Sequence, residues 1–239
     1  YGINLISYYV SFDGVNYRKD RAEVSAEDFY REMAEKPGVY PKTSMPTQVD
    51  FYEAFLPYAE KGEKVIYLNL TSKFISLACT QYRCWEEFAR LLDKPLAAFI
   101  QIYKPAYFER IGLRYVNFIS RKALGLEATP YRDLIAQRYL GVMDDEQIAE
   151  PHVGRSSVDA EVALRGGCRV KLHAGPGQVH RAGKSDGEVK FIFDQDLYMP
   201  GKIAPNLSAP ALQTLHALAW SIFRDAITDE LHDAMEPMD

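Results

Sequence analysis

The spacing of the apolar residues changes along this chain, and that change constrains the fold more than any other feature. Residues 65–70, Val-Ile-Tyr-Leu-Asn-Leu, form a short and almost continuous apolar run, which predicts a strand buried on both faces. Further along, apolar and polar residues alternate over residues 110–118, 158–164 and 168–174. Alternation predicts strands with one buried and one solvated face, as in an antiparallel sheet.

Helical patterns lie between these strands. Ser25 and Thr47 stand where N-caps belong, and the second of these helices leads through a glycine loop into the apolar run. A third helix is predicted over residues 85–103, where Pro95 should end or kink it, and a long amphipathic helix begins at Ser208. We therefore expect an α/β plus α+β protein, in which a partial parallel-type αβ unit precedes an antiparallel sheet with a long carboxy-terminal helix.

The change of pattern also predicts two domains, residues 1–66 and residues 67–239. The net charge is −5, which excludes a protein whose main work is neutralising phosphates. No run approaches the ~20 apolar residues that span a bilayer. Three cysteines without a C-x-x-C pair fit reduced thiols better than disulfides or a structural zinc site, and no signal-peptide pattern is present, so we expect a cytoplasmic protein.

Four stretches in the first third of the chain match one bacterial family. They are residues 10–18, residues 25–30, residues 41–46 (Pro-Lys-Thr-Ser-Met-Pro) and residues 50–55. In this order they resemble the amino-terminal domain of the DegV family of bacterial fatty-acid-binding proteins. The resemblance implies that Thr43 and Ser44 help to hold the carboxylate of a fatty acid. It also places the second hydroxyl cluster of that family at residues 71–77, beginning with Thr71 and Ser72. Ile75 and Ser76 replace the Ser-Gly pair of that cluster, so we expect the ligand site to be incomplete here.

From residue 68 to its end, the chain resembles a sporadically distributed bacterial family of unknown function. The stretches that carry this resemblance are residues 69–77, 85–88, 110–117, 193–196 and 223–231, with the strand motif Arg-Ile-Gly-Leu-Arg-Tyr at residues 110–115. This second resemblance implies no activity. Because the two resemblances meet near residues 64–70, we interpret the chain as a fusion of two pieces, either natural or engineered.

Two arginines on the predicted strand 110–118 have two interpretations. Arg110 and Arg114 could bind an anion, because guanidinium groups form bidentate contacts with phosphate or carboxylate. Alternatively, they pair with Asp194 or Asp196 on a neighbouring strand, as cross-strand charge pairs commonly do. The two aspartates alone are a weak signal for a magnesium site.

Three functional hypotheses remain open. No nucleophile elbow, Walker loop or dinucleotide fingerprint is present, and the sequence implies no catalytic group, cofactor or metal. The first hypothesis is a non-enzymatic protein that binds a fatty acid or other acyl ligand through the DegV-like segment. The second is an interaction module without a small ligand, in which the final helix and exposed aromatic residues (Trp85, Tyr103, Tyr107) meet a protein partner or a second copy. The third is an enzyme that uses the Arg and Asp residues on a phosphorylated substrate.

Overall fold

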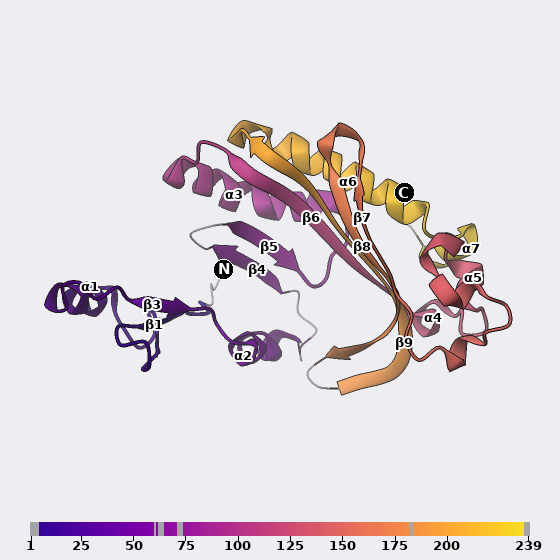
Figure 1. Ribbon diagram of the computed structural model, residues 1–239, viewed down its shortest axis with the longest axis horizontal. Coiled ribbons are helices and arrows are strands. Elements are labelled where there is room, and N and C mark those ends of the chain that lie inside the picture. Colours follow the sequence, from indigo (N-terminus) through magenta and orange to yellow (C-terminus); the bar gives the residue numbers. More distant parts are fainter. Residues whose placement is uncertain (1–4, 60, 62–64, 71–73, 182–183, 237–239) are drawn as a thin grey trace. The chain divides into compact units, whose positions relative to one another are not determined.

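A computed structural model describes residues 5–59, 61, 65–70, 74–181 and 184–236 of the chain (Figure 1). The contacts divide the chain into two compact units, Tyr1–Cys84 and Trp85–Asp239. The division falls after the last strand of the first unit. The predicted domain boundary between residues 66 and 67 stays a prediction.

The first unit contains two small antiparallel sheets and two helices. Its elements are β1 (Tyr9–Ser11), β2 (Arg18–Lys19), α1 (Ala26–Glu35), β3 (Lys42–Ser44), α2 (Gln48–Ala59), β4 (Ile66–Leu70) and β5 (Ile75–Cys79). β1 lies between β2 and β3, and β4 pairs with β5. The predicted N-cap Ser25 is confirmed, since its hydroxyl oxygen accepts a hydrogen bond from the backbone N–H of Asp28 at 3.0 Å.

The parallel-type unit expected around residues 65–70 is not confirmed. The strand exists as β4, but its partner is β5, which runs antiparallel to it with Leu68 opposite Leu77. Ile66, Leu68 and Leu70 are each 43–44% exposed, so the strand is half-buried and not covered on both faces. A continuous apolar run does not specify its pairing partner, and here a short connection to β5 favours a hairpin.

The second unit is built on a four-stranded antiparallel sheet. Its elements are α3 (Trp85–Tyr103), β6 (Phe108–Ile119), α4 (Arg121–Leu124), α5 (Tyr131–Leu134), β7 (Val158–Ala163), β8 (Arg169–Arg181), β9 (Lys184–Ile203), α6 (Ser208–Arg224) and α7 (Asp229–Ala234). The strand order is β6-β9-β8-β7, and every neighbouring pair is antiparallel. The mixed fold, the antiparallel sheet and the carboxy-terminal helix therefore agree with the prediction.

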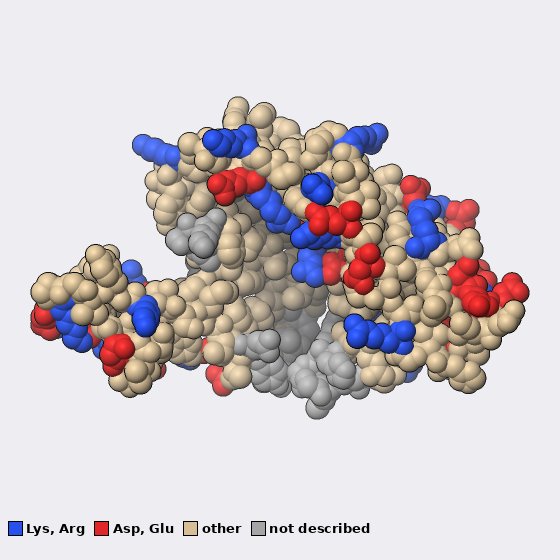
Figure 2. Space-filling model, in the orientation of Figure 1, with Lys and Arg blue, Asp and Glu red and all other residues tan. Residues whose placement is uncertain are grey.

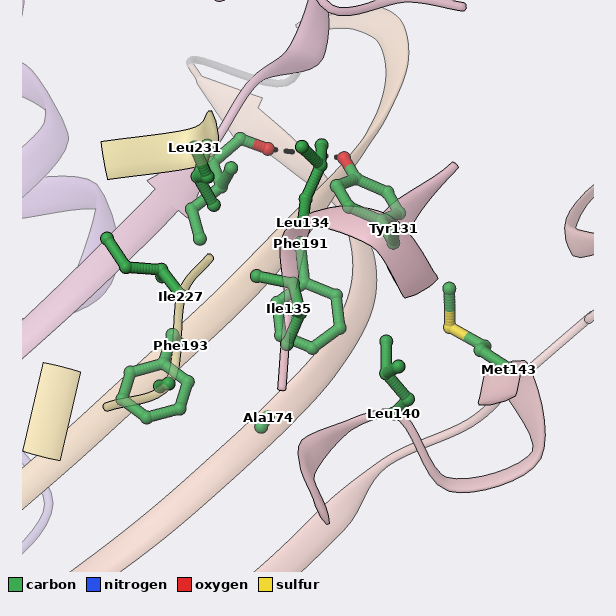
Figure 3. Close-up of a cluster of buried hydrophobic side chains, with 12 residues drawn as sticks. Tyr131, Leu134, Ile135, Leu140, Met143, Ala174, Phe191, Phe193, Ile227 and Leu231 are labelled. Carbon is green, nitrogen blue, oxygen red and sulfur yellow. Dashed lines mark hydrogen bonds between the residues drawn. The ribbon is translucent and has the colours of Figure 1, made fainter. Parts of the chain in front are cut away.

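One face of this sheet is packed and the other is solvated, as alternation predicts. On the packed face, Leu113 and Leu197 meet Leu215 of α6, which runs along the sheet (Figure 1). A second cluster joins Phe191 of β9 to Tyr131 of α5 and to residues of α7 (Figure 3). The core of this unit thus lies between the sheet and the helices, which leaves the outward-facing side chains of the strands free to carry charge.

Two glycine features fix the hairpin between β7 and β8. Gly166 and Gly167 adopt φ angles of 69° and 74°, the left-handed region that the tight turn requires. At Gly175 the chain before β7 lies directly over β8, because a Cβ added there would stand 2.4 Å from the carbonyl oxygen of Ser156. Only a residue without a side chain permits this close approach of two backbone segments.

The helix predicted over residues 85–103 is confirmed as α3, which continues through Pro95 to Tyr103, so that proline does not end it. The helix predicted to begin at Ser208 is confirmed as α6, which ends at Arg224. Ala226 and Ile227, which continue its apolar pattern, are buried in the turn before α7.

Candidate functional site

The predicted carboxylate-binding hydroxyls lie on β3, at the edge of the three-stranded sheet. Thr43 and Ser44 are both exposed, and the Ser44 hydroxyl donates to the carbonyl oxygen of Met45 at 3.4 Å. Exposed hydroxyls at a sheet edge can donate to an external acceptor such as a carboxylate. The other two predicted ligand residues, Thr71 and Ser72, lie outside the described residues.

The segment that follows β3 is anchored by Asp50 of α2. The carboxylate accepts hydrogen bonds from the backbone N–H of Thr47 (2.8 Å) and from its hydroxyl (2.6 Å). The Tyr9 hydroxyl of β1 donates to it at 2.9 Å, and the Lys19 ammonium of β2 lies 2.8 Å away. Hydrogen bonds from Lys19 and Thr47 hold the pKa of the Asp50 carboxyl well below its usual range. One side chain therefore ties β1, β2 and the start of α2 together.

Sequence reasoning did not single out this anchor as part of the candidate site. Thr47 and Asp50 stand three residues apart, the spacing of a reciprocal helix cap, and that spacing is the available signal. Nothing in the sequence indicates that Tyr9 and Lys19 join them, because both come from strands far from the helix in the chain. The Tyr9 phenol responds to the same contact, since its hydrogen bond to Asp50 raises its pKa.

Aromatic side chains connect α2 to the β4–β5 hairpin. The ring of Phe51 lies 5.3 Å from that of Tyr67, and the ring of Phe55 lies 5.8 Å from it, both in edge-on arrangements. A hydrogen bond from the Tyr8 hydroxyl to Asn69 of β4 adds a polar link at 3.3 Å. This side of the hairpin is thus packed within the first unit, while the half-exposed aliphatic side chains of β4 point to its other side.

The two arginines of the candidate anion site are both paired. Arg110 donates to both carboxylate oxygens of Asp196, at 2.8 and 2.9 Å. Arg114 donates from Nε to Asp194 at 2.8 Å, and from Nη2 to the second oxygen of the same carboxylate. Its hydrogen bonds to Asp194 raise the pKa of Arg114. The structure thus has the cross-strand pairing of the second interpretation.

These pairs belong to a larger array on the solvated side of the sheet. In three rows, which we call rungs, one residue from each of β7, β8, β9 and β6 faces its neighbours across the strands. The first rung is Asp159, His173, Asp194 and Val116; the second is Glu161, Lys171, Asp196 and Arg114; the third is Ala163, Arg169, Tyr198 and Gly112. We call these twelve residues together with Arg110 the charged face. Figure 2 shows blue and red side chains intermingled over these strands.

Tyr198 of β9 lies in the third rung of the charged face. Its hydroxyl donates to Glu161 of β7 at 2.5 Å, and this hydrogen bond raises the pKa of the phenol. The Arg110 guanidinium lies over its ring, 4.7 Å from the centroid. Gly112 leaves room for this arrangement, because a Cβ there would stand 2.7 Å from Nη1 of Arg110. The aromatic ring therefore bridges cations and anions of neighbouring strands.

Two shallow hollows open on the charged face around Lys171. One, of about 280 Å³, is lined among others by Arg114, His173 and Asp194, and the other, of about 350 Å³, includes Glu161. Both hollows are open to solvent. Because cations and anions line them together, neither provides the uniform positive charge that a phosphorylated substrate favours.

Trp85, expected to be an exposed aromatic residue, is buried. It is 9% exposed, stacks on His216 of α6 with ring centroids 4.6 Å apart, and donates from Nε1 to Gln213 at 2.7 Å. Trp85 begins α3 on the apolar side of that helix, which turns it into the core. Of the other two aromatic residues in that hypothesis, Tyr103 is 59% and Tyr107 38% exposed.

Among residues 5–236 with the gaps given above, no group of three or more His, Cys, Asp and Glu side chains could hold a metal ion. Over the same ranges, no helix combines the length and the apolar character that crossing a membrane requires.

Comparison with known proteins identifies relatives of the amino-terminal part of the chain. Residues 1–79 match the model of a family described as uncharacterised protein, DegV family. The chain is 35% identical over 74 residues to a DegV domain-containing protein of Caldanaerobacter subterraneus subsp. tengcongensis, which is 31% of this chain and 25% of that protein. It is 29% identical over 82 residues to a DegV domain-containing protein of Clostridium perfringens, which is 34% of this chain and 28% of that protein.

The chain thus spans about a quarter of the length of these curated relatives. No solved structure matches it. The resemblance of the amino-terminal segment to the DegV family is confirmed, and it covers part of a DegV protein.

Proposed function

We propose that the first unit of this protein binds a fatty acid or another acyl ligand, and that Thr43 and Ser44 hold its carboxylate. The match of residues 1–79 to the DegV family is the observation that carries this proposal. The exposure of both hydroxyls supports it, and so does Lys42, an exposed cation on the same short strand.

Two interactions of different size would contribute to binding. A charge-assisted hydrogen bond from a hydroxyl to a carboxylate contributes about 1.5–3 kcal/mol. Removing an acyl chain of sixteen carbons from water contributes roughly 12 kcal/mol before the costs of association, at about 0.8 kcal/mol per methylene. The chain of the ligand therefore dominates affinity, whereas the hydroxyls select a carboxylate end. Half-exposed aliphatic side chains of the first unit, such as Leu68, are suited to the apolar part.

Native mass spectrometry of the 239-residue chain, followed by solvent extraction, tests the proposal directly. We expect an acyl ligand to co-purify with the protein. The proposal would be contradicted if repeated preparations carried no acyl ligand and the protein took up no added palmitate. Replacing Thr43 and Ser44 by Ala should weaken palmitate binding about tenfold or more, because two charge-assisted hydrogen bonds are lost. Thr214→Ala, which removes an exposed threonine hydroxyl from α6, is the matched control and should bind normally.

A further inference from the structure

On the charged face the sign of the charge alternates from strand to strand, with anions on β7 and β9 and cations on β8 and β6. Along the second rung, Glu161, Lys171, Asp196 and Arg114 read anion, cation, anion, cation from β7 to β6. Their side chains reach solvent, with 62% of Arg114 and 42% of Glu161 exposed. An ordered array of this kind presents a specific pattern to a partner, and not merely a hydrophilic surface.

The sum of the charges limits the kind of partner. The cations of the charged face are Arg110, Arg114, Lys171 and Arg169, and its anions are Asp159, Glu161, Asp194 and Asp196. With four of each, the face has no net charge when His173 is neutral. A nucleic acid or an anionic membrane is attracted by a surplus of cations, which this face does not offer. A partner must instead present the same two signs in a matching order.

A second copy of the chain meets that requirement. A rung of four alternating charges becomes its own complement when it is turned by half a revolution about an axis that passes between β8 and β9, parallel to the strands. The rotation brings Glu161 opposite Arg114 and Lys171 opposite Asp196 of the second copy. We propose that the charged face is a docking surface for a second copy of this chain, related to the first by this two-fold axis.

The other two rungs fit the same operation. In the first rung the rotation places His173 opposite Asp194, and Asp159 opposite the uncharged Val116. In the third rung it places Arg169 opposite the ring of Tyr198. No like charges meet in any rung. Isologous interfaces require a patch that is complementary to itself, and all three rungs satisfy this condition under one axis.

The geometry of sheets is compatible with this arrangement. Twisted sheets that pack face to face keep their strands within about 30° of each other, and a two-fold axis parallel to the strands satisfies this condition. Twist makes the match best at the central rung and weaker toward the ends. That central rung contains Lys171, which makes no ion pair within its own chain among the described residues and lies 5.9 Å from the ring of Tyr198. Its ammonium is thus available to Asp196 of the second copy.

Two charge reversals, each made in the 239-residue chain, test the proposal. In the proposed dimer, Lys171→Glu sets two anions against each other at both symmetric contacts, and Asp196→Lys sets two cations against each other. Each variant alone should dissociate about tenfold more readily, or more, than the unaltered protein. A mixture of the two should associate again, because Glu at 171 of one copy then faces Lys at 196 of the other. Lys122→Glu in α4 makes the same change of charge outside the charged face and should leave association unchanged.

Sedimentation velocity over a range of concentrations, at low and at high ionic strength, gives the readout, and circular dichroism shows that each variant is folded. We expect a dimer that weakens as salt is added, since exposed ion pairs are screened. If Asp196→Lys does not fold, the reversals Lys171→Glu and Arg114→Glu remain, and each should on its own weaken association about tenfold or more. A protein that is monomeric at all concentrations, a dimer that tolerates Lys171→Glu, or variants that do not associate when mixed would each overturn the proposal. None of these outcomes bears on acyl binding by the first unit.

Discussion

The hydroxyl of Tyr131 offers a sensitive test of how the second unit is held together. Tyr131 of α5 is fully buried in the second hydrophobic cluster of this unit (Figure 3). Its hydroxyl lies 3.2 Å from the carbonyl oxygen of Ile119 and 3.0 Å from that of Val189. These two carbonyls belong to the end of β6 and to β9, so one phenol connects a helix to both strands. Burial raises the pKa of Tyr131, which keeps the phenol protonated and able to donate.

Tyr131→Phe removes this donor and leaves the ring in place against Phe191, whose centroid is 5.4 Å away. A buried carbonyl that loses its donor costs about 1–3 kcal/mol. Since the hydroxyl has one proton to share between two carbonyls, we expect a loss of about 1–2 kcal/mol of unfolding free energy, at the lower end of this range. With a urea dependence of about 2 kcal/mol per molar, the middle of the usual range for small proteins, the midpoint of unfolding should fall by roughly 0.5–1 M.

Tryptophan fluorescence is a suitable probe for this experiment. Both tryptophans of the chain, Trp85 and Trp220, lie in the second unit, so that their emission reports the unfolding of that unit alone. The matched control is Tyr103→Phe, which removes a hydroxyl that is exposed to solvent and should change stability by less than about 0.5 kcal/mol. Equal midpoints for the two variants would show that the Tyr131 hydroxyl does not stabilise the fold, and would refute the reasoning.

Three further predictions follow from the titratable and thiol groups. The pKa of Asp50 is lowered in the folded state, so its contribution to the stability of the first unit is present above about pH 5 and is lost as the pH falls. Thermal unfolding followed by circular dichroism should show this acid dependence in the unaltered protein and not in Asp50→Asn. Burial lowers the pKa of His216, so the second unit should lose stability as the pH falls below about 6.5, and an imidazole titration by NMR that shows no lowered pKa would contradict this. Cys168 is fully buried with a raised pKa, so iodoacetamide should label Cys79 and Cys84 in the native protein and leave Cys168 unmodified, as mass spectrometry can show.

Alternation along the chain was sufficient to predict the sheet of the second unit. The strands near residues 110–118, 158–164 and 168–174 are where the pattern places them, because one face of the sheet is buried and the other is exposed to solvent. Alternation could not predict which strand pairs with β4, because the pairing and burial of a short apolar run depend on its tertiary neighbours. The spacing of Met33, four residues after Phe29, likewise predicts a buried side of a helix, yet no residue of α1 is buried. Burial here again depends on tertiary neighbours.

The candidate sites divide in a similar way. The pairing of Arg114 with an aspartate on the next strand followed from residue types and strand positions. The alternation along the second rung did not, because it depends on three strand registers at once, and the sequence contains no local signal for a register. The anchor at Asp50 likewise required long-range contacts, with Tyr9 and Lys19, that a local cap signal cannot reveal.

The close crossing at Gly175 has a consequence for the whole array of charges. Ser157 alone separates the crossing residue Ser156 from the first residue of β7, so the chain has no slack with which β7 could slide along β8. A shift of β7 by two residues along β8 would keep the same side chains of β7 on the packed face, so the apolar core alone would not prevent it. Such a shift would nevertheless move Glu161 away from Lys171 and disrupt the alternation of charge across the strands. The absence of a side chain at Gly175 thus fixes the register between β7 and β8. Any larger residue at position 175 should leave the protein folded but shift the charges of β7 relative to those of β8.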